Sequence, residues 1–305
     1  MQLIKRIFFF ALTNIAVLAL LSVVMAGVNI FFPGILDQAG GMGGILIYAV
    51  VIGFGGSFIS LFLSKWMAKK MYSIVLLDRD TSQRDQKLAV VWDTVERISQ
   101  AKNIKMPEVG YYESAEPNAF ATGASKNNSL VAVSTGLLNN MEKGEIEGVV
   151  GHEMAHILNG DMVTLTLIQG VLNTFVIVLA NLAAKAISSF LTRDDEEGGL
   201  GWLAYQGVYI ACQMVFGFLA MFVVMWFSRI REYRADLGGA EYTSKSKMIS
   251  GLKRLQKMTA LVHTPMNTEE KKMSAFMITS PDSIFSTHPS LDNRIKALEE
   301  NYKLI

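Results

Sequence analysis

The sequence has little cysteine and no excess of charge of one sign. Cys212 is the only cysteine among 305 residues, so one chain can form neither an internal disulfide nor a metal site built from several thiolates. Lys and Arg number 28 against 27 Asp and Glu, a balance that creates no extended field of one sign for binding a nucleic acid. Nucleic acid is therefore not expected as a partner, and any metal would have to be bound by His and carboxylate side chains.

Long apolar runs are abundant instead. Hydrophobic residues make up 51% of the sequence and the mean hydropathy is +0.31, more than the core of one soluble domain needs. Four stretches contain no charged residue, and each exceeds the ~20 residues that a helix needs to cross a bilayer. They span residues 7–36, 38–64, 162–184 and 198–228. We predict four transmembrane helices, because the remaining sequence is too short to enclose four such helices in a soluble core. The first stretch is longer than the ~7 to 15 apolar residues of a signal peptide, so we expect it to be retained.

Basic residues flank these predicted spans unevenly. They precede the first span, follow the second and follow the fourth, whereas the two remaining loops, around Asp37 and from Arg193 to Glu197, contain one basic residue and are otherwise neutral or acidic. The flanking residues are Lys5, Arg6, Lys65, Lys69, Lys70, Arg229, Arg231 and Arg234. Because positively charged flanks of transmembrane helices stay in the cytoplasm, we expect both termini and the polar segments on that side of the membrane.

The predicted topology divides the chain into four parts. Residues 1–64 form two transmembrane helices and residues 162–228 a transmembrane hairpin, which leaves residues 65–161 and 229–305 free to form one cytoplasmic domain. In that domain we expect helices near 86–102 and 142–158, strands near 108–113 and 130–134, and a loop at 262–285. The expected fold class is a membrane α-helical anchor with an α+β domain.

A metal-binding motif lies in the helix expected near residues 142–158. The sequence reads His152-Glu-Met-Ala-His156, the H-E-x-x-H pattern of zinc metallopeptidases. Residues four apart share one face of a helix, so both imidazoles can bind one cation while Glu153 projects toward a water on that cation. The pattern predicts one zinc ion per chain, although it also occurs in helices that bind no metal.

The third ligand has to come from a distant part of the chain. Catalytic zinc usually has three protein ligands and a water, and no further histidine follows within the motif helix. Glu232 comes just after the last predicted span, where the chain has returned to the cytoplasm. Asp236 lies one helical turn later, suited to orienting an imidazole through its second nitrogen. We therefore predict His152, His156 and Glu232 as zinc ligands; the alternative is an ordinary charged start of an amphipathic helix.

This set of residues predicts hydrolysis of peptide bonds. Zinc would polarise the scissile carbonyl and lower the pKa of its water toward ~7, so that Glu153 could remove a proton and pass it to the leaving amine. A membrane scaffold with a structural zinc is the non-enzymatic alternative. Structural sites usually have four protein ligands, however, and no fourth ligand is evident in the sequence.

At these residues the chain resembles the HtpX family of bacterial inner-membrane zinc proteases, which is related to the CAAX prenyl proteases. The likeness runs from the paired N-terminal spans through Asn118-Ala-Phe-Ala, the motif at His152 and the segment around Glu232 to Thr287-His-Pro and Arg294. It implies a zincin-like cytoplasmic domain on a four-helix anchor in the lipid bilayer of the bacterial inner membrane. Its substrates would be polypeptides, namely damaged or unfolded membrane proteins removed in quality control.

The resemblance also implies a strand beside the metal. Asn118, Ala119, Phe120 and Ala121 would form an edge strand, to which an extended substrate adds by backbone pairing. Asn118 is equally consistent with a turn residue after Pro117.

Two residues near the C-terminus complete the site that the resemblance implies. His288 would stabilise the oxyanion as a catalytic residue, with Arg294 nearby at the substrate. His288 is equally consistent with the start of a terminal helix whose first residue is Pro289. A prenyl-protein protease is the enzymatic alternative, but it would need a chamber for a lipidated tail, for which four spans are few.

Overall fold

The computed structural model describes residues 30, 42–191, 201–262 and 288–300, and the chain divides into two units. The first, here called the helical unit, comprises Met1–Ser60 and Thr164–Val224. The second, here called the sheet unit, comprises Leu61–Val163 and Met225–Ile305. These boundaries lie near the ends of the second and fourth predicted spans and the start of the third.

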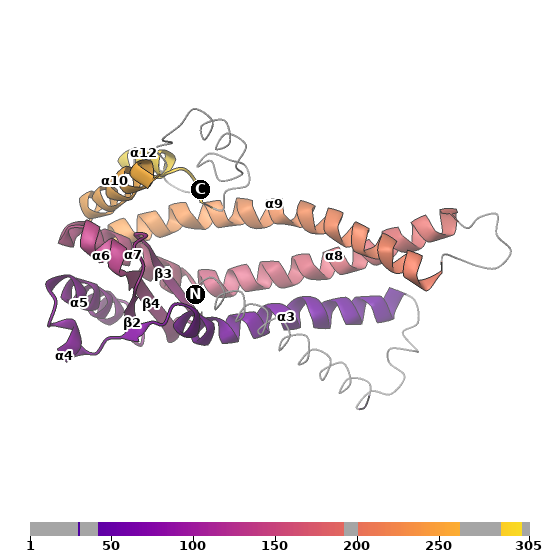
Figure 1. Ribbon diagram of the computed structural model, residues 1–305, viewed down its shortest axis with the longest axis horizontal. Helices are drawn as coiled ribbons and strands as arrows, with labels where there is room; N and C mark the ends of the chain where they lie inside the picture. Colours follow the sequence, from indigo (N-terminus) through magenta and orange to yellow (C-terminus); the bar gives the residue numbers. More distant parts are fainter. Residues whose placement is uncertain (1–29, 31–41, 192–200, 263–287, 301–305) are drawn as a thin grey trace. The chain divides into compact units, whose positions relative to one another are not determined.

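Helices dominate both units (Figure 1). In chain order the elements are α3 (Met42–Met71), β1 (Val75–Leu76), α4 (Arg79–Ser82), α5 (Gln86–Ala101), β2 (Glu108–Tyr112), β3 (Ala119–Ser125), β4 (Asn128–Ser134), α6 (Thr135–Asn140), α7 (Lys143–Asn159), α8 (Asp161–Leu191), α9 (Trp202–Tyr242), α10 (Lys245–Val262) and α12 (Leu291–Glu299).

Within the described part of the chain, three helices are long and apolar enough to cross a membrane: Gly43–Met71, Asp161–Leu191 and Trp202–Tyr242. The second of these helices contains the third predicted span, at 162–184, and the other two overlap most of the second and fourth predicted spans, at 38–64 and 198–228. The first predicted span and the loop expected at 262–285 lie outside the described residues, except for Ile30 and Val262. α9 does not end where its apolar stretch ends at residue 228 but continues to Tyr242, so Glu232 and Asp236 lie on the same helix as the last span.

Polar side chains join α3 and α8 inside the helical unit. The Thr174 hydroxyl donates to the Ala49 carbonyl at 3.2 Å, and Asn173 Nδ2 donates to Ser57 Oγ at 3.5 Å. Between apolar helices such hydrogen bonds add to van der Waals packing, because few other polar partners exist in hydrocarbon. They fix which faces of the two helices meet.

The sheet unit is built around a four-stranded sheet with the order β1-β2-β4-β3. β4 pairs parallel with β2 and antiparallel with β3, with Val131 opposite both Val109 and Ala121. Leu130 to Val133 of β4 are fully buried, as expected for a central strand covered on both faces. β3 pairs on one side only, so it is an edge strand among the described strands.

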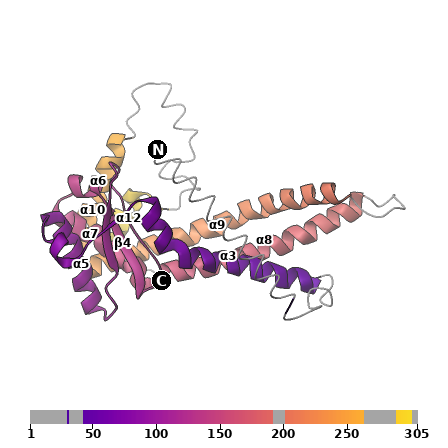
Figure 2. The ribbon, with the colours of Figure 1, turned by 60° about the horizontal axis from the view of Figure 1, so that its bottom comes forward.

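Apolar faces of the surrounding helices form the core against this sheet. α5 buries Val91, Val95 and Ile98 at the predicted helical spacing, and α7 contributes Val150 and Met154 to the same cluster. α7 packs against both α5 and α10, and α10 also contacts α12, as the two views show (Figures 1 and 2). α7 is therefore held on several sides, which makes it a rigid carrier for its side chains.

Two elements begin two residues away from the positions considered in the sequence. β4 begins at Asn128 rather than Leu130, and the terminal helix begins at Leu291 rather than Pro289. The Ser290 hydroxyl accepts a hydrogen bond from the Asn293 backbone N–H at 3.4 Å, so Ser290 is the N-cap and Pro289 precedes the helix.

The close packing of α7 on α10 gives a first prediction. A Cβ on Gly148 would lie 2.4 Å from the backbone oxygen of Lys247, so Gly148→Ala has to push the two helices apart. We expect a loss of about 1–3 kcal/mol in the free energy of unfolding, measured by denaturant unfolding in detergent.

Gly144→Ala, one turn earlier on α7, is the matched control. Its Cβ would meet only Lys247 Cγ, at 3.7 Å. This variant should be neutral or stabilised by up to about 1 kcal/mol, because alanine favours helix more than glycine does. Equal losses in both variants would contradict the packing described.

Candidate metal centre

α7 presents two imidazoles on one face. His152 and His156 lie one turn apart, and their Nε2 atoms are 3.1 Å from each other. The helix starts at a capping interaction, in which Glu145 accepts a hydrogen bond from the Glu142 backbone N–H at 2.9 Å. It ends at Gly160, whose φ of 70° is left-handed and turns the chain back toward His156. Both ligand candidates thus lie on a capped, buried helix.

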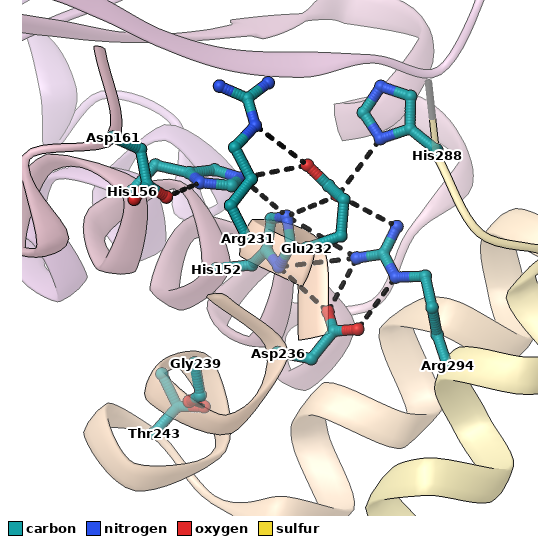
Figure 3. A network of polar contacts seen from close by, with 10 residues as sticks. All are labelled: His152, His156, Asp161, Arg231, Glu232, Asp236, Gly239, Thr243, His288 and Arg294. Atoms are coloured by element: carbon teal, nitrogen blue, oxygen red, sulfur yellow. Dashed lines mark hydrogen bonds and ion pairs between the residues drawn. The ribbon is translucent and has the colours of Figure 1, made fainter. Parts of the chain in front are cut away.

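Glu232 of α9 faces these two imidazoles (Figure 3). Its side chain is 1% exposed, with Oε2 3.4 Å from His152 Nε2 and Oε1 3.4 Å from His156 Nε2. Neither oxygen has a hydrogen bond of good geometry within the described part of the chain. A buried carboxylate in this state is costly unless a cation compensates it.

The distances among these groups fit a metal ion. Their three ligand atoms lie within 4.8 Å of one another. Tetrahedral zinc with bonds of ~2.0–2.1 Å keeps its ligand atoms about 3.3 Å apart. The two Nε2 atoms are 3.1 Å apart, and each lies 3.4 Å from a different oxygen of Glu232, so each of these contacts is close to that spacing. The three side chains are therefore grouped closely enough to be candidate ligands of one divalent cation.

Each imidazole also contacts a carboxylate through its other nitrogen. His152 Nδ1 lies 2.9 Å from Asp236 Oδ1, and His156 Nδ1 lies 2.6 Å from Asp161 Oδ2. Such carboxylates hold the ring orientation and make the imidazole a better ligand. Asp236 has the position expected from the sequence, but the contact of Asp161 was not expected. The sequence did contain one indication of this contact: Gly160 follows the motif helix directly. A glycine there predicts a helix end after which the next residue, Asp161, can contact the last turn of the helix.

Arg294 of α12 ties the C-terminal helix to this cluster. Its Nη2 lies 2.6 Å from Asp236 Oδ1, its Nε donates to Oδ2 at 2.8 Å, and its side chain is 8% exposed. Nη1 also lies 3.4 Å from Glu232 Oε2. Arg294 was expected to contact the substrate, but two nitrogens of its guanidinium bind the Asp236 carboxylate. Arg294 also borders the cavity described below.

Two further basic side chains approach Glu232 (Figure 3). His288, just before α12, places Nδ1 3.0 Å from Oε2 while 58% of its side chain stays exposed. Arg231 Nε lies 3.9 Å from Oε1. In the sequence, Arg231 served only as one of the basic residues that indicate the cytoplasmic end of the fourth span. The sequence does not show which of these basic side chains points toward the metal centre.

The buried charges shift the protonation of the two imidazoles. Burial alone would lower the pKa of His156, but its contacts with Asp161 and Glu232 outweigh burial and raise that pKa to about 9. Burial likewise opposes protonation of His152, whose pKa is nevertheless raised by Asp236 and Glu232. A metal-free centre therefore holds protons that a cation has to displace.

A cavity of about 150 Å³ opens beside the centre and is bordered by His152, Glu153 and Glu232. Asn118, just before β3, and Ala119, its first residue, border it as well. Glu153 thus borders the same cavity as two of the three possible ligands and the start of the edge strand.

The rest of the predicted edge strand faces elsewhere. The Phe120 ring stacks with Tyr72 and Tyr112 at centroid distances of 5.3 and 5.7 Å, and Ala121 packs against the core. Only the backbone of these two residues remains for contact with a substrate.

Comparisons with known proteins agree with this geometry. The sequence model of Peptidase family M48 matches residues 84–302, a range that includes every residue of the centre. Proteins named Protease HtpX from Shewanella oneidensis and Tolumonas auensis are 50% and 47% identical to this chain. Each match covers 97% of this chain and 99% of the relative. The crystal structure of S. mikatae Ste24p matches with a TM-score of 0.63 over 96% of this chain and 67% of that chain; at 17% identity it shows a common fold.

The raised imidazole pKa values predict how metal binding depends on pH. With a pKa of about 9, His156 is protonated at neutral pH in the metal-free protein and loses its proton when zinc binds. Apparent zinc affinity should rise by at least about tenfold per pH unit between pH 7 and pH 9, because His152, whose pKa is also raised, can release a second proton, and the contribution of His156 should level off above pH 9. Competition with a chelator of known pH dependence measures this, and an affinity that stays constant from pH 7 to 9 would contradict the assignment.

Asp161→Asn should weaken zinc binding by about 10- to 100-fold, because the amide keeps the shape but loses the charge that supports His156. The rise of zinc affinity with pH should also stop at a lower pH in this variant. Without the Asp161 carboxylate, the pKa of His156 is lower. Glu241→Gln is the control: this α9 carboxylate pairs with Lys102 at 2.8 Å, away from the centre, and its loss should leave zinc affinity unchanged.

Proposed function

The chain belongs to peptidase family M48, and from this membership we propose that His152, His156 and Glu232 would hold a zinc ion and that Glu153 is the catalytic base for the hydrolysis of peptide bonds. The protein is a membrane-bound metalloendopeptidase: its relatives over nearly the whole chain are proteases, and three of its described helices are long and apolar enough to span a bilayer. What we propose beyond this is that the metal is zinc and that the individual residues have the roles given above.

The observation that carries the proposal is the buried Glu232 carboxylate, 3.4 Å from each of two Nε2 atoms that are themselves 3.1 Å apart. Two imidazoles and one carboxylate are a ligand set of catalytic zinc, with one position left for water. Calcium and magnesium prefer sites made only of oxygen atoms. We therefore assign one zinc ion per chain.

Glu153 is suited to the proton transfers of hydrolysis. When bound, zinc polarises the scissile carbonyl and lowers the pKa of a coordinated water toward ~7. Glu153 borders the cavity beside His152, within reach of a water and a peptide bond there. It would accept the proton of the water and deliver it to the leaving amine. The exposed His288 imidazole, 3.0 Å from Glu232, would stabilise the negative oxygen that forms on the attacked carbonyl.

The edge of the sheet supports an extended polypeptide as the substrate. β3 pairs with β4 on one side, and its first residue borders the cavity next to Glu153. A substrate strand that adds to the other side of β3 would carry its backbone past the metal centre. Only an unfolded or locally unfolded segment can be extended in this way, which supports damaged membrane proteins as substrates and a role in quality control.

The charge pattern supports a location in the inner membrane of bacteria, with both termini and the metal centre in the cytoplasm. Lys65, Lys69 and Lys70 follow one span, and Arg229 and Arg231 follow another. Positive flanks of this kind stay on the cytoplasmic side. The relatives named Protease HtpX are bacterial.

Glu153→Gln should retain stoichiometric zinc but lower the cleavage rate by about 10²- to 10⁴-fold or more, because the amide cannot accept the proton of the water. The assay is cleavage of an unfolded membrane protein by the detergent-solubilised full chain with zinc, with metal content measured on the same samples. Glu232→Gln is the companion variant and should lose zinc itself. Equal cleavage by wild type and Glu153→Gln would end the proposed mechanism.

A further inference from the structure

The sheet unit contains the metal centre and also one end of each long apolar helix. It includes α3 from Leu61, α8 as far as Val163 and α9 from Met225. The apolar stretches of the three helices end inside these ranges, next to charged residues, and such residues mark the membrane surface. The height of the metal centre above the membrane surface can therefore be followed inside this one unit.

The metal-binding side chains lie close to these ends. Glu232 follows Ser228, the last residue of the fourth apolar stretch, by four residues of the same helix, a rise of about 6 Å. His156 precedes Met162, the first residue of the third stretch, by six residues, which a helix covers in about 9 Å. The metal centre is therefore no more than about 10 Å above the membrane surface.

The edge strand β3 connects the cavity with that surface. Its first residue, Ala119, borders the cavity beside the metal centre. Its last residue, Ser125, pairs with Asn128 at the start of β4. Lys65 of α3, the first charged residue after the second apolar stretch, donates a hydrogen bond to Asn128 Oδ1 at 2.5 Å. β3 therefore begins at the cavity and ends at the membrane surface.

Further contacts hold this end of the sheet at the surface. Lys65 also donates to Glu108 Oε1 at 3.0 Å, and Lys69 pairs with the other oxygen of Glu108, the first residue of β2. Beyond the end of β3, Lys126 Cε lies 3.9 Å from the position that a Cβ on Gly160 would occupy, between α7 and α8. Because α3 and the start of α8 both meet this end of the sheet, the direction of β3 relative to the surface is fixed.

We propose that β3 determines where a membrane protein is cut, and that the cleaved bond lies within about ten residues of the end of a transmembrane segment. The proposal rests on the proposed function and adds the substrate class to it, namely juxtamembrane segments. An extended chain covers about 3.3 Å per residue, so the shortest route from the surface to the metal centre takes about three residues. A route along the whole of β3 takes the 7 residues of that strand.

This restriction would spare folded membrane proteins. In this chain, α3 and α9 continue as helices past their apolar stretches, to Met71 and Tyr242. A juxtamembrane segment in a helix has no free backbone groups for pairing with a strand, whereas an unfolded segment has. Cleavage would therefore need a substrate that has lost its structure next to the membrane.

The test uses the full chain with zinc in phospholipid vesicles. The substrate has one transmembrane helix and an unfolded tail of identical repeats, each of about ten residues. Because every repeat has the same sequence, mass spectrometry of the products reports the effect of position alone. The first repeat should be cut about tenfold more often than the third, since the effective concentration of a tethered site falls roughly as the −3/2 power of tether length. The same tail without the transmembrane helix should be cut in all repeats at similar rates.

A double variant of the enzyme separates the role of β3 from tethering alone. Glu108→Gln together with Asn128→Ala weakens the contacts of this end of the sheet with Lys65 and Lys69. This variant should lose the preference for the first repeat but cut the soluble tail at the wild-type rate. Asn127→Ala is the control, because Asn127 Oδ1 accepts from the Lys105 backbone N–H at 3.0 Å; it should keep the preference.

The outcomes separate the role of β3 from the proposed function. Cuts that depend on Glu153 but are spread evenly over the anchored tail overturn the role of β3 and leave the function standing. A preference for the first repeat that the double variant retains overturns it as well. Cleavage that is equal in Glu153→Gln overturns the function itself. If the double variant fails to fold, as judged by zinc content and unfolding temperature, Asn128→Ala alone decides in the same way.

Discussion

The sheet unit is organised around one buried carboxylate that faces two imidazoles. Glu232 is 1% exposed and surrounded by nitrogen atoms of His152, His156, His288 and Arg294 at 3.0 to 3.4 Å. Burying a carboxylate carries a large desolvation cost, which only positive charge close by can offset. The Glu232 carboxylate has to lie beside the two histidines of α7. This requirement constrains the relative positions of α7, α9 and α12.

The surrounding contacts show how that requirement is met. α7 is capped at its start, ends at a left-handed Gly160 and packs on α5 and α10, so its histidines have little freedom. Asp161 and Asp236 hold the far sides of the two rings, and Arg294 joins Asp236 to the last helix. Segments that are remote in the sequence thus become one charge network, whose open side faces the cavity and the start of β3.

Sequence reasoning predicted the parts of this arrangement that follow from periodicity. Apolar residues at helical spacing identified α5, charge-free runs identified the apolar cores of α3, α8 and α9, and the spacing of His152 and His156 identified a shared face of α7. The choice of Glu232 followed from topology together with zinc chemistry, and the structure brings that carboxylate to both imidazoles. Family membership, expected from the motifs, is confirmed by the match over residues 84–302.

Other features depended on packing that no local pattern reveals. Asp161 contacts His156 just after Gly160, whose left-handed backbone separates α7 from α8, and Arg294 meets Asp236 from α12, which packs on α10. The side chain of Phe120, for which backbone pairing with a substrate was the only expected role, stacks with Tyr72 and Tyr112. The cavity beside the metal centre is bordered by residues of α6, α7 and α10, which sequence analysis had no means to bring together.

The most direct test of the account is X-ray absorption spectroscopy at the zinc edge on the loaded, detergent-solubilised protein. The account predicts two imidazole nitrogens and at least two oxygens, from Glu232 and water, at ~2.0–2.2 Å, with no sulfur. Glu232→Ala should change the oxygen shell or lose the metal. A shell with sulfur, with a single imidazole, or identical in wild type and Glu232→Ala would contradict it.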